Sequence, residues 1–152
     1  MSLDIIPLPR RDRMAILARS NGGRLRDLWS TLGLDPAYKS VRGPEAGLVM
    51  LRGRVGGTGE AFNVGEATVT RASVKLEDGS IGHAMALGRD VEKARLSAVI
   101  DALCQDAAMA ARIDAALIAP IKSELDAADE KRRQETAATR VDFFTMVRGE
   151  DQ

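Results

Sequence analysis

Apolar and polar positions alternate with two different periods along the chain. Near the N-terminus, apolar residues recur at spacings of three and four in residues 12–19 and again just beyond them. That spacing is typical of amphipathic helices. The second stretch carries the longer apolar stripe: Leu25, Leu28, Trp29 and Leu32. Gly33 and Pro36 are placed to end it. The pattern therefore predicts a pair of short helices, with Trp29 as a packed anchor between them.

The middle third of the chain alternates with a period of two, which is typical of β-strands with one buried face. The candidate strands are residues 38–42, 47–55, 67–76 and 80–87. Asp78-Gly79 separates the last two, and this dipeptide is a strong signal for a tight hairpin. One face of the last strand holds only small residues: Gly82, Ala84 and Ala86. We therefore predict an antiparallel β-sheet of about four strands, with its small face close under a helix.

Helical spacing returns after Asp90, whose carboxylate is placed to accept hydrogen bonds from the free N–H groups of the next turn. A second helical region begins near Ala110, and Pro120 is predicted to kink or divide it. Residues 122–140 are polar on all sides, as in a helix that is solvated or bridges to another element. The chain is thus predicted to be a single domain, residues 1–152, of the α+β class. An N-terminal helix pair and long C-terminal helices pack on the antiparallel sheet.

The two ends of the chain differ from the rest in composition. Residues 1–10 contain two prolines and are predicted to form an extended arm. Residues 140–152 bring an apolar tail to the end of a polar helix, where it is poorly placed to serve its own core. We predict that this tail docks on a partner chain; the alternative is that it folds back as an edge strand. The predicted interface residues are Phe143, Phe144, Met146 and Arg148.

Residues 52–71 hold five of the fourteen glycines. Gly56, Gly57 and Gly59 predict a flexible turn whose N–H groups are able to face an anion. The alternative is a plain β-turn or bulge joining two strands. The spacing matches neither a P-loop nor a dinucleotide-binding fingerprint. The candidate residues for substrate or anion binding are Arg54, Gly56, Gly57, Thr58, Gly59 and Arg89.

Composition excludes several classes of function. The formal net charge is zero, from 22 basic and 22 acidic residues, which argues against a nucleic-acid binder. No apolar run is long enough to cross a membrane, and we expect a soluble, cytoplasmic protein. A single cysteine, Cys104, and a single histidine, His83, do not suffice for a closed zinc site, so no metal is expected. Cys104 is predicted to be packed and inert.

No catalytic constellation stands out from the residues. His83 alternates with apolar neighbours and is more consistent with a core or interface position than with catalysis. As a general base it would need a carboxylate partner, for which Asp90 and Glu60 are the candidates. His83 and Glu60 are therefore only weak catalytic candidates, and the catalytic residues stay unknown.

The glycine stretch also carries a family resemblance. Gly56-Gly57-Thr58-Gly59-Glu60, Asp78-Gly79, Gly88-Arg89-Asp90 and the tail from Arg140 to Gly149 together resemble the PhnG family. The resemblance covers nearly the whole chain. It implies a subunit of the carbon–phosphorus lyase system for phosphonate breakdown.

The resemblance also implies partners and a reaction. With PhnH, PhnI and the accessory PhnL, such a subunit supports transfer of a phosphonate to the ribose of ATP. Adenine is displaced, and the product is a ribose 1-phosphonate 5-triphosphate. PhnJ completes the core complex. The chain is expected to be inactive alone, to bind no cofactor by itself, and to form a homodimer when isolated. The alternative is a stand-alone phosphate- or nucleotide-binding module, or a purely scaffolding module without catalysis.

Overall fold

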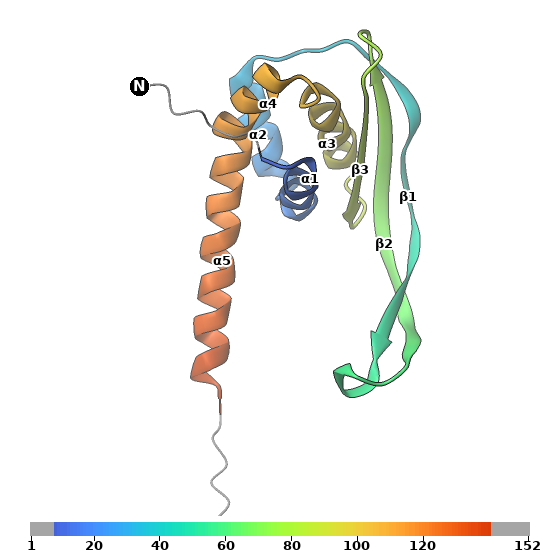
Figure 1. Ribbon diagram of the computed structural model, residues 1–152, viewed down its shortest axis with the longest axis vertical. Helices are drawn as coiled ribbons and strands as arrows, with labels where there is room; N and C mark the ends of the chain where they lie inside the picture. Colours follow the sequence, from blue (N-terminus) through green and yellow to red (C-terminus); the bar gives the residue numbers. More distant parts are fainter. Residues whose placement is uncertain (1–7, 141–152) are drawn as a thin grey trace, which may run out of the picture.

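The computed structural model describes residues 8–140, and these form one layer of helices beside one β-sheet (Figure 1). The elements follow in this order: α1 (Arg10–Arg19), α2 (Gly22–Leu32), β1 (Tyr38–Arg54), the 3-10 turn η1 (Val55–Gly57), β2 (Ala61–Leu76), β3 (Ile81–Leu87), α3 (Val91–Leu103), α4 (Ala107–Ile113), the π-helical segment η2 (Asp114–Ile118) and α5 (Ala119–Ala138). The α+β class, the N-terminal helix pair and the long C-terminal helix are confirmed.

Both helices of the pair end where the sequence predicts, but α1 begins at Arg10, before the predicted position 12, and α2 already begins at Gly22. The Asn21 side chain accepts a hydrogen bond from the backbone N–H of Arg24 and so caps the start of α2. Gly33 ends α2 in the left-handed conformation, with φ 62°. Trp29 is half-buried and touches both hydrophobic clusters of the molecule, which fits its predicted role as an anchor.

The sheet has three strands in the described chain, in the order β1-β2-β3, where about four were expected. The two segments predicted as residues 38–42 and 47–55 form one continuous strand, β1. Between them, Gly43 and Pro44 form a bulge: the pairing with β2 shifts and then resumes at Glu45. Glu45 bridges Arg42 and Arg71 across this irregularity. The glycine and proline thus bend the strand without ending it.

Helix α3 covers the small face of β3 directly, as predicted. Gly82 is buried, and a Cβ built on it would lie 2.5 Å from the backbone nitrogen of Ala102 and closer still to the carbonyl oxygen of Ala98. Only glycine permits this approach of strand and helix. The cluster beneath consists of Ala72, Val74, Leu76, Ala94, Ala98, Val99 and Ala102.

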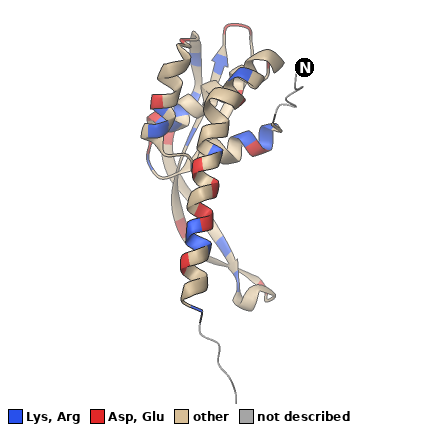
Figure 2. Cartoon of the chain, turned by 90° about the vertical axis from the view of Figure 1, so that its left-hand side faces the viewer, with Lys and Arg blue, Asp and Glu red and all other residues tan. Residues whose placement is uncertain are grey.

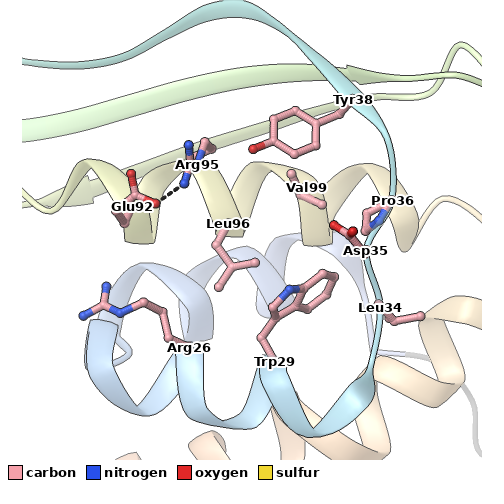
Figure 3. A pocket seen from close by; sticks show the side chains of 10 residues that line it. All are labelled: Arg26, Trp29, Leu34, Asp35, Pro36, Tyr38, Glu92, Arg95, Leu96 and Val99. Carbon is pink, nitrogen blue, oxygen red and sulfur yellow. Dashed lines mark hydrogen bonds and ion pairs between the residues drawn. The ribbon is translucent and has the colours of Figure 1, made fainter.

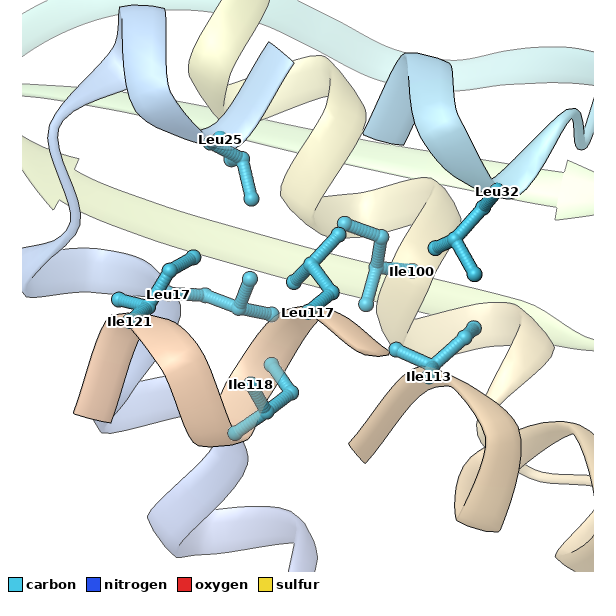
Figure 4. Packing of buried hydrophobic residues seen from close by; sticks show 8 residues of the cluster. All are labelled: Leu17, Leu25, Leu32, Ile100, Ile113, Leu117, Ile118 and Ile121. Atoms are coloured by element: carbon cyan, nitrogen blue, oxygen red, sulfur yellow. The ribbon is translucent and has the colours of Figure 1, made fainter. Parts of the chain in front are cut away.

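A second hydrophobic cluster joins the helices to one another (Figure 4). Its buried members come from six elements, α1, α2, α3, α4, η2 and α5: Leu17, Leu25, Leu32, Ile100, Ile113, Leu117, Ile118 and Ile121. Helix α3 contributes to both clusters and therefore ties the sheet to the helix layer. The C-terminal helices pack on this layer.

The predicted break at Pro120 takes the form of a π-helical segment. Proline has no N–H, and its ring clashes with the carbonyl four residues earlier, so a regular helix is disfavoured there. The chain instead widens into η2, directly before Pro120. Asp114 opens this segment and forms a buried ion pair with Arg13, at 2.7 Å between Nε and Oδ1. The backbone N–H of Leu8 also donates to Asp114, at 3.0 Å.

Two elements extend from this body in the same direction, α5 and the far part of the β1–β2 hairpin (Figure 1). Residues 131–140 are exposed throughout, so the predicted polar character of this helix is confirmed. Acidic and basic residues interleave along α5 (Figure 2) and form ion pairs such as Lys122 with Asp126. Residues 1–7 of the predicted N-terminal arm and residues 141–152 of the predicted tail lie outside the described residues.

Candidate functional site

The far part of the β1–β2 hairpin stands free of the third strand. β3 ends at Leu87, opposite Val69, so residues 61–68 of β2 pair with β1 alone. We call residues 47–68 the hairpin arm. Its large apolar side chains are exposed on both faces: Leu48 is 63% exposed and Met50 54%, whereas Leu51 on the opposite face is 45% exposed. Val55, Phe62 and Val64 near the tip are exposed as well.

Leu48 and Met50 lie on the face that α3 covers higher in the sheet. They pair with Thr68 and Glu66, and Thr68 is two residues before the buried Thr70. Since side chains alternate along a strand, all of these point to one side. Helix α3 does not extend over the arm (Figure 1). The inner face of the arm thus exposes Leu48 and Met50 beside two polar side chains, and the described chain leaves it uncovered.

The predicted glycine turn forms the tip of the arm. Gly56 and Gly57 adopt the left-handed conformation, with φ 59° and 79°. The turn is closed by the N–H of Gly59, which donates to the Val55 carbonyl at 3.0 Å, and by Arg54, which donates to the Gly59 carbonyl at 3.0 Å. The plain turn is therefore present in full. Anion binding at this tip stays a prediction, and Arg54 already serves the turn.

Arg89 lies far from the tip. The N–H of Gly88 donates to the carbonyl of Thr68, so the Gly88-Arg89-Asp90 segment sits where the arm begins. Seven residues along β2 separate Thr68 from Ala61, the residue at which β2 begins beside the tip. At the usual rise per residue this distance is roughly 23 Å. Arg89 and the glycine turn therefore do not form one site within a single chain.

His83 occupies the open face of the sheet and is exposed. Its Nδ1 lies 2.8 Å from the Ser73 hydroxyl. A carboxylate does approach this residue, but Asp101 accepts from the backbone N–H of His83, at 2.9 Å, and not from the ring. The predicted carboxylate partners are elsewhere: Glu60 is at the tip, and Asp90 caps α3 by accepting from the N–H of Lys93. His83 thus has no acid–base partner in the described chain.

Other chemistry is also missing from residues 8–140. They contain no group of acidic, histidine and cysteine side chains that could hold a metal ion. Cys104 packs against the helical cluster as predicted, and burial raises the pKa of its thiol to about 12; its inertness stays a prediction. No helix within the described range has the length and apolar content to cross a bilayer.

The structure shows one pocket that sequence patterns did not indicate (Figure 3). We call it the Trp29–Tyr38 pocket. Its volume is about 240 Å³. Its walls come from α2, the 33–37 linker, the start of β1 and α3: Arg26, Trp29, Leu34, Asp35, Pro36, Tyr38, Glu92, Arg95, Leu96 and Val99. These segments are distant in sequence, so only the tertiary fold brings them together.

Comparison with known proteins adds the family. The family model described as phosphonate metabolism protein PhnG matches residues 8–149. A relative from Rhizobium meliloti (strain 1021) is 53% identical over 142 residues, which is 93% of this chain and 90% of the relative. That relative is the alpha-D-ribose 1-methylphosphonate 5-triphosphate synthase subunit PhnG.

The chain belongs to the PhnG family. The motifs that carried the resemblance now separate into two kinds. In this PhnG-family chain, Asp90 has a structural task as the α3 cap, and the hydrogen bond from the Lys93 N–H is the main cause that lowers its pKa. The turn at Asp78-Gly79 is likewise structural, because Asp78 accepts from the N–H of Ser80 at 2.8 Å.

The second kind of motif residue has a side chain without a structural task. The side chains of Thr58 and Glu60 at the tip are exposed and make no hydrogen bond or ion pair with other described residues, although the backbone N–H of Thr58 donates to the Val55 carbonyl and caps η1. Side chains of this kind at the end of a projecting arm are available to a partner or a ligand.

Proposed function

We propose that this chain works only within an assembly and contributes binding surface there instead of a catalytic centre of its own. It is a subunit of a multi-subunit ribose 1-methylphosphonate 5-triphosphate synthase in phosphonate metabolism. The synthase makes a ribose triphosphate product, which implies ATP as its substrate.

The hairpin arm is the observation that supports this role best. Its exposed large apolar side chains are concentrated on both faces of one projecting ribbon, and exposed apolar clusters mark sites of protein association. On the inner face of the arm, Leu48 and Met50 are more than half exposed. An isolated two-stranded ribbon is also marginally stable in water. A partner that covers the arm would bury these side chains and hold the ribbon in place.

The arm and α5 together define where such a partner would lie. Both project in the same direction from the body (Figure 1). A partner packed against the inner face of the arm would lie on the side of the sheet along which α5 runs (Figure 1). We propose that the core partners are PhnH, PhnI and PhnJ, with PhnL as an accessory, and that PhnI covers the arm. The tail residues Phe143, Phe144, Met146 and Arg148 would add a further anchor, because buried aromatic side chains dominate interface energies.

The tip of the arm gives the chain a route to the reaction. We propose that a partner's active site receives the tip, where the N–H groups of Gly56 and Gly57 and the Thr58 hydroxyl would face phosphate oxygens. The arginines Arg52 and Arg54 would supply positive charge. Arg89, roughly 23 Å away, would act at a different surface.

The experiment measures turnover and assembly separately. The chain is co-expressed with PhnH, PhnI, PhnJ and PhnL, and consumption of ATP with methylphosphonate is followed by release of adenine. For Gly57→Ala we expect turnover to fall by at least tenfold while the purified complex keeps its composition. Gly65→Ala is the matched control, since that glycine has open space around it and needs no special backbone angle.

The outcomes separate the candidate roles. Loss of turnover with intact assembly supports a tip that lines the active site. Loss of both together supports a scaffolding role for the arm. Unchanged turnover in both variants contradicts the proposal for the tip. Turnover by the chain in the absence of its partners contradicts the proposal as a whole.

A further inference from the structure

The Trp29–Tyr38 pocket is not part of the arm, and the proposed function does not use it. Figure 3 shows its two aromatic side chains on opposite sides, with Trp29 rising from α2 and Tyr38 descending from the start of β1. Leu96 and Val99 of α3 lie between them. The pocket thus offers two aromatic rings and an aliphatic floor to whatever enters it.

The charged side chains at the mouth are not equivalent. Arg26 forms an ion pair with Asp90, at 3.4 Å. Arg95 forms one with Glu92, which lies one turn before it on the same helix. Both arginines that line the pocket are therefore already neutralised by carboxylates.

Asp35 is the exception. Its side chain lines the same pocket, yet it makes no hydrogen bond or ion pair with any residue between 8 and 140. The carboxylates Asp35, Glu92 and Asp90 outnumber the arginines by one. The pocket consequently combines aromatic walls with one unpaired negative charge.

We propose that this pocket binds the guanidinium group of an arginine side chain presented by a partner protein. A guanidinium group is planar and weakly hydrated, and its face stacks on indole and phenol rings. Its edge carries paired N–H donors that match a carboxylate, which Asp35 provides. The methylene stem of the arginine packs against Leu96 and Val99.

Charge complementarity selects this occupant over others. A phosphate-bearing ligand would meet Asp35 unfavourably, and both arginines would first have to leave their carboxylates. An uncharged apolar side chain would leave Asp35 unpaired. That a partner protein supplies the arginine rests on the subunit role proposed above, whereas the affinity of the pocket for guanidinium does not.

The test uses the full-length chain and a small probe. Trp29 is the sole tryptophan, so its indole N–H gives a single resonance in a proton–nitrogen NMR spectrum. The probe is Nα-acetyl-arginine amide, and the matched control is Nα-acetyl-citrulline amide, which has the same shape without the charge. We expect the arginine probe to shift the Trp29 resonance in a saturable way, and citrulline to bind at least tenfold more weakly.

Substitution of Asp35 supplies the second readout. Asp35→Asn keeps the size of the side chain and removes its charge, and we expect it to weaken the arginine probe by about tenfold. The affinity in the parent chain should also fall as salt is raised. Equal binding of arginine and citrulline, tighter binding of AMP than of arginine, or no shift of the Trp29 resonance with any probe would each overturn the proposal.

The origin of the arginine is tested in the assembly. Asp35→Arg should lower recovery of the co-expressed complex by at least tenfold, because it places a like charge against the incoming guanidinium. Glu77→Arg makes the same charge change in the turn after β2 and should leave recovery unchanged. If the probe binds as expected but Asp35→Arg assembles normally, the pocket binds guanidinium, and the proposal that a partner subunit supplies the arginine is wrong.

Discussion

Replacement of Gly82 by alanine tests the packing on which the whole fold depends. The new methyl group would lie 2.5 Å from the Ala102 nitrogen and 2.9 Å from the Ala102 Cβ, where ordinary contact begins at 3.4 Å. The first of these neighbours is backbone of α3 and has no rotamer to change. Helix α3 must therefore move away from β3 by about 1 Å or more. We expect a large loss of stability, since α3 also holds the second hydrophobic cluster.

The size of the effect follows from the packing. Overpacking of a well-packed core typically costs about 1–3 kcal/mol, and a clash with backbone lies at or above the upper end of that range. For a domain of this length, each kcal/mol lowers the melting temperature by roughly 2–4 °C. A loss of about 3 kcal/mol therefore predicts a melting temperature lower by roughly 6–12 °C.

Thermal unfolding of the purified chain, followed by circular dichroism, measures this change. Gly65→Ala is the control: it lies in β2, has open space around it, and should change stability by less than about 0.5 kcal/mol. If Gly82→Ala unfolds within about 1 kcal/mol of the parent, α3 does not approach β3 as described.

Three further perturbations test other parts of the structure. Arg13→Ala leaves the buried carboxylate of Asp114 without its partner and should cost about 3–5 kcal/mol in urea unfolding, unless Asp114→Asn is added. Asp90→Ala should cost about 1 kcal/mol through loss of the α3 cap. The pKa of Asp90 is lowered in the folded chain, so its contribution is present above its ordinary pKa near 4 and is lost as pH falls through the lower folded value. The stability difference between parent and Asp90→Ala should therefore vanish in acid, and persistence there would argue against the cap. Cys104, with its raised pKa, should resist a thiol reagent at pH 8 until the chain is unfolded in urea, and rapid modification of the folded chain would contradict its burial.

Local patterns predicted much of the fold because they report local physics. The cap at Asp90, the end of α2 at Gly33 and the hairpin at Asp78-Gly79 each depend on a few adjacent residues. The small face of β3 was also visible, since only its alternate positions lack bulk. The strand count differed because Gly43-Pro44 reads locally as a turn, whereas pairing with β2 on both sides keeps the chain extended.

The candidate site was harder to predict for the same physical reason. The sequence indicated the glycine turn. It did not indicate that the turn closes a two-stranded arm that continues past the end of β3, because this depends on the relative lengths of three strands. Arg89 and the turn carry similar chemistry, and only the register places them far apart. The Trp29–Tyr38 pocket had no local signal at all. Asp35 and Tyr38 are three residues apart, but Trp29 and Arg95 join them only through the packing of α2 against α3.

In the proposed role, a partner subunit covers the hairpin arm of this chain. The most direct measurement is the mass of the complex recovered when the chain is co-expressed with PhnH, PhnI and PhnJ. The variant Leu48→Ser/Met50→Ser changes two exposed side chains and should leave the isolated chain folded. Val41→Ser, at a position 58% exposed on the same strand but outside the arm, is the control. We expect full assembly with Val41→Ser and little or none with the arm variant. Full assembly with the arm variant would show that a different surface holds the partner.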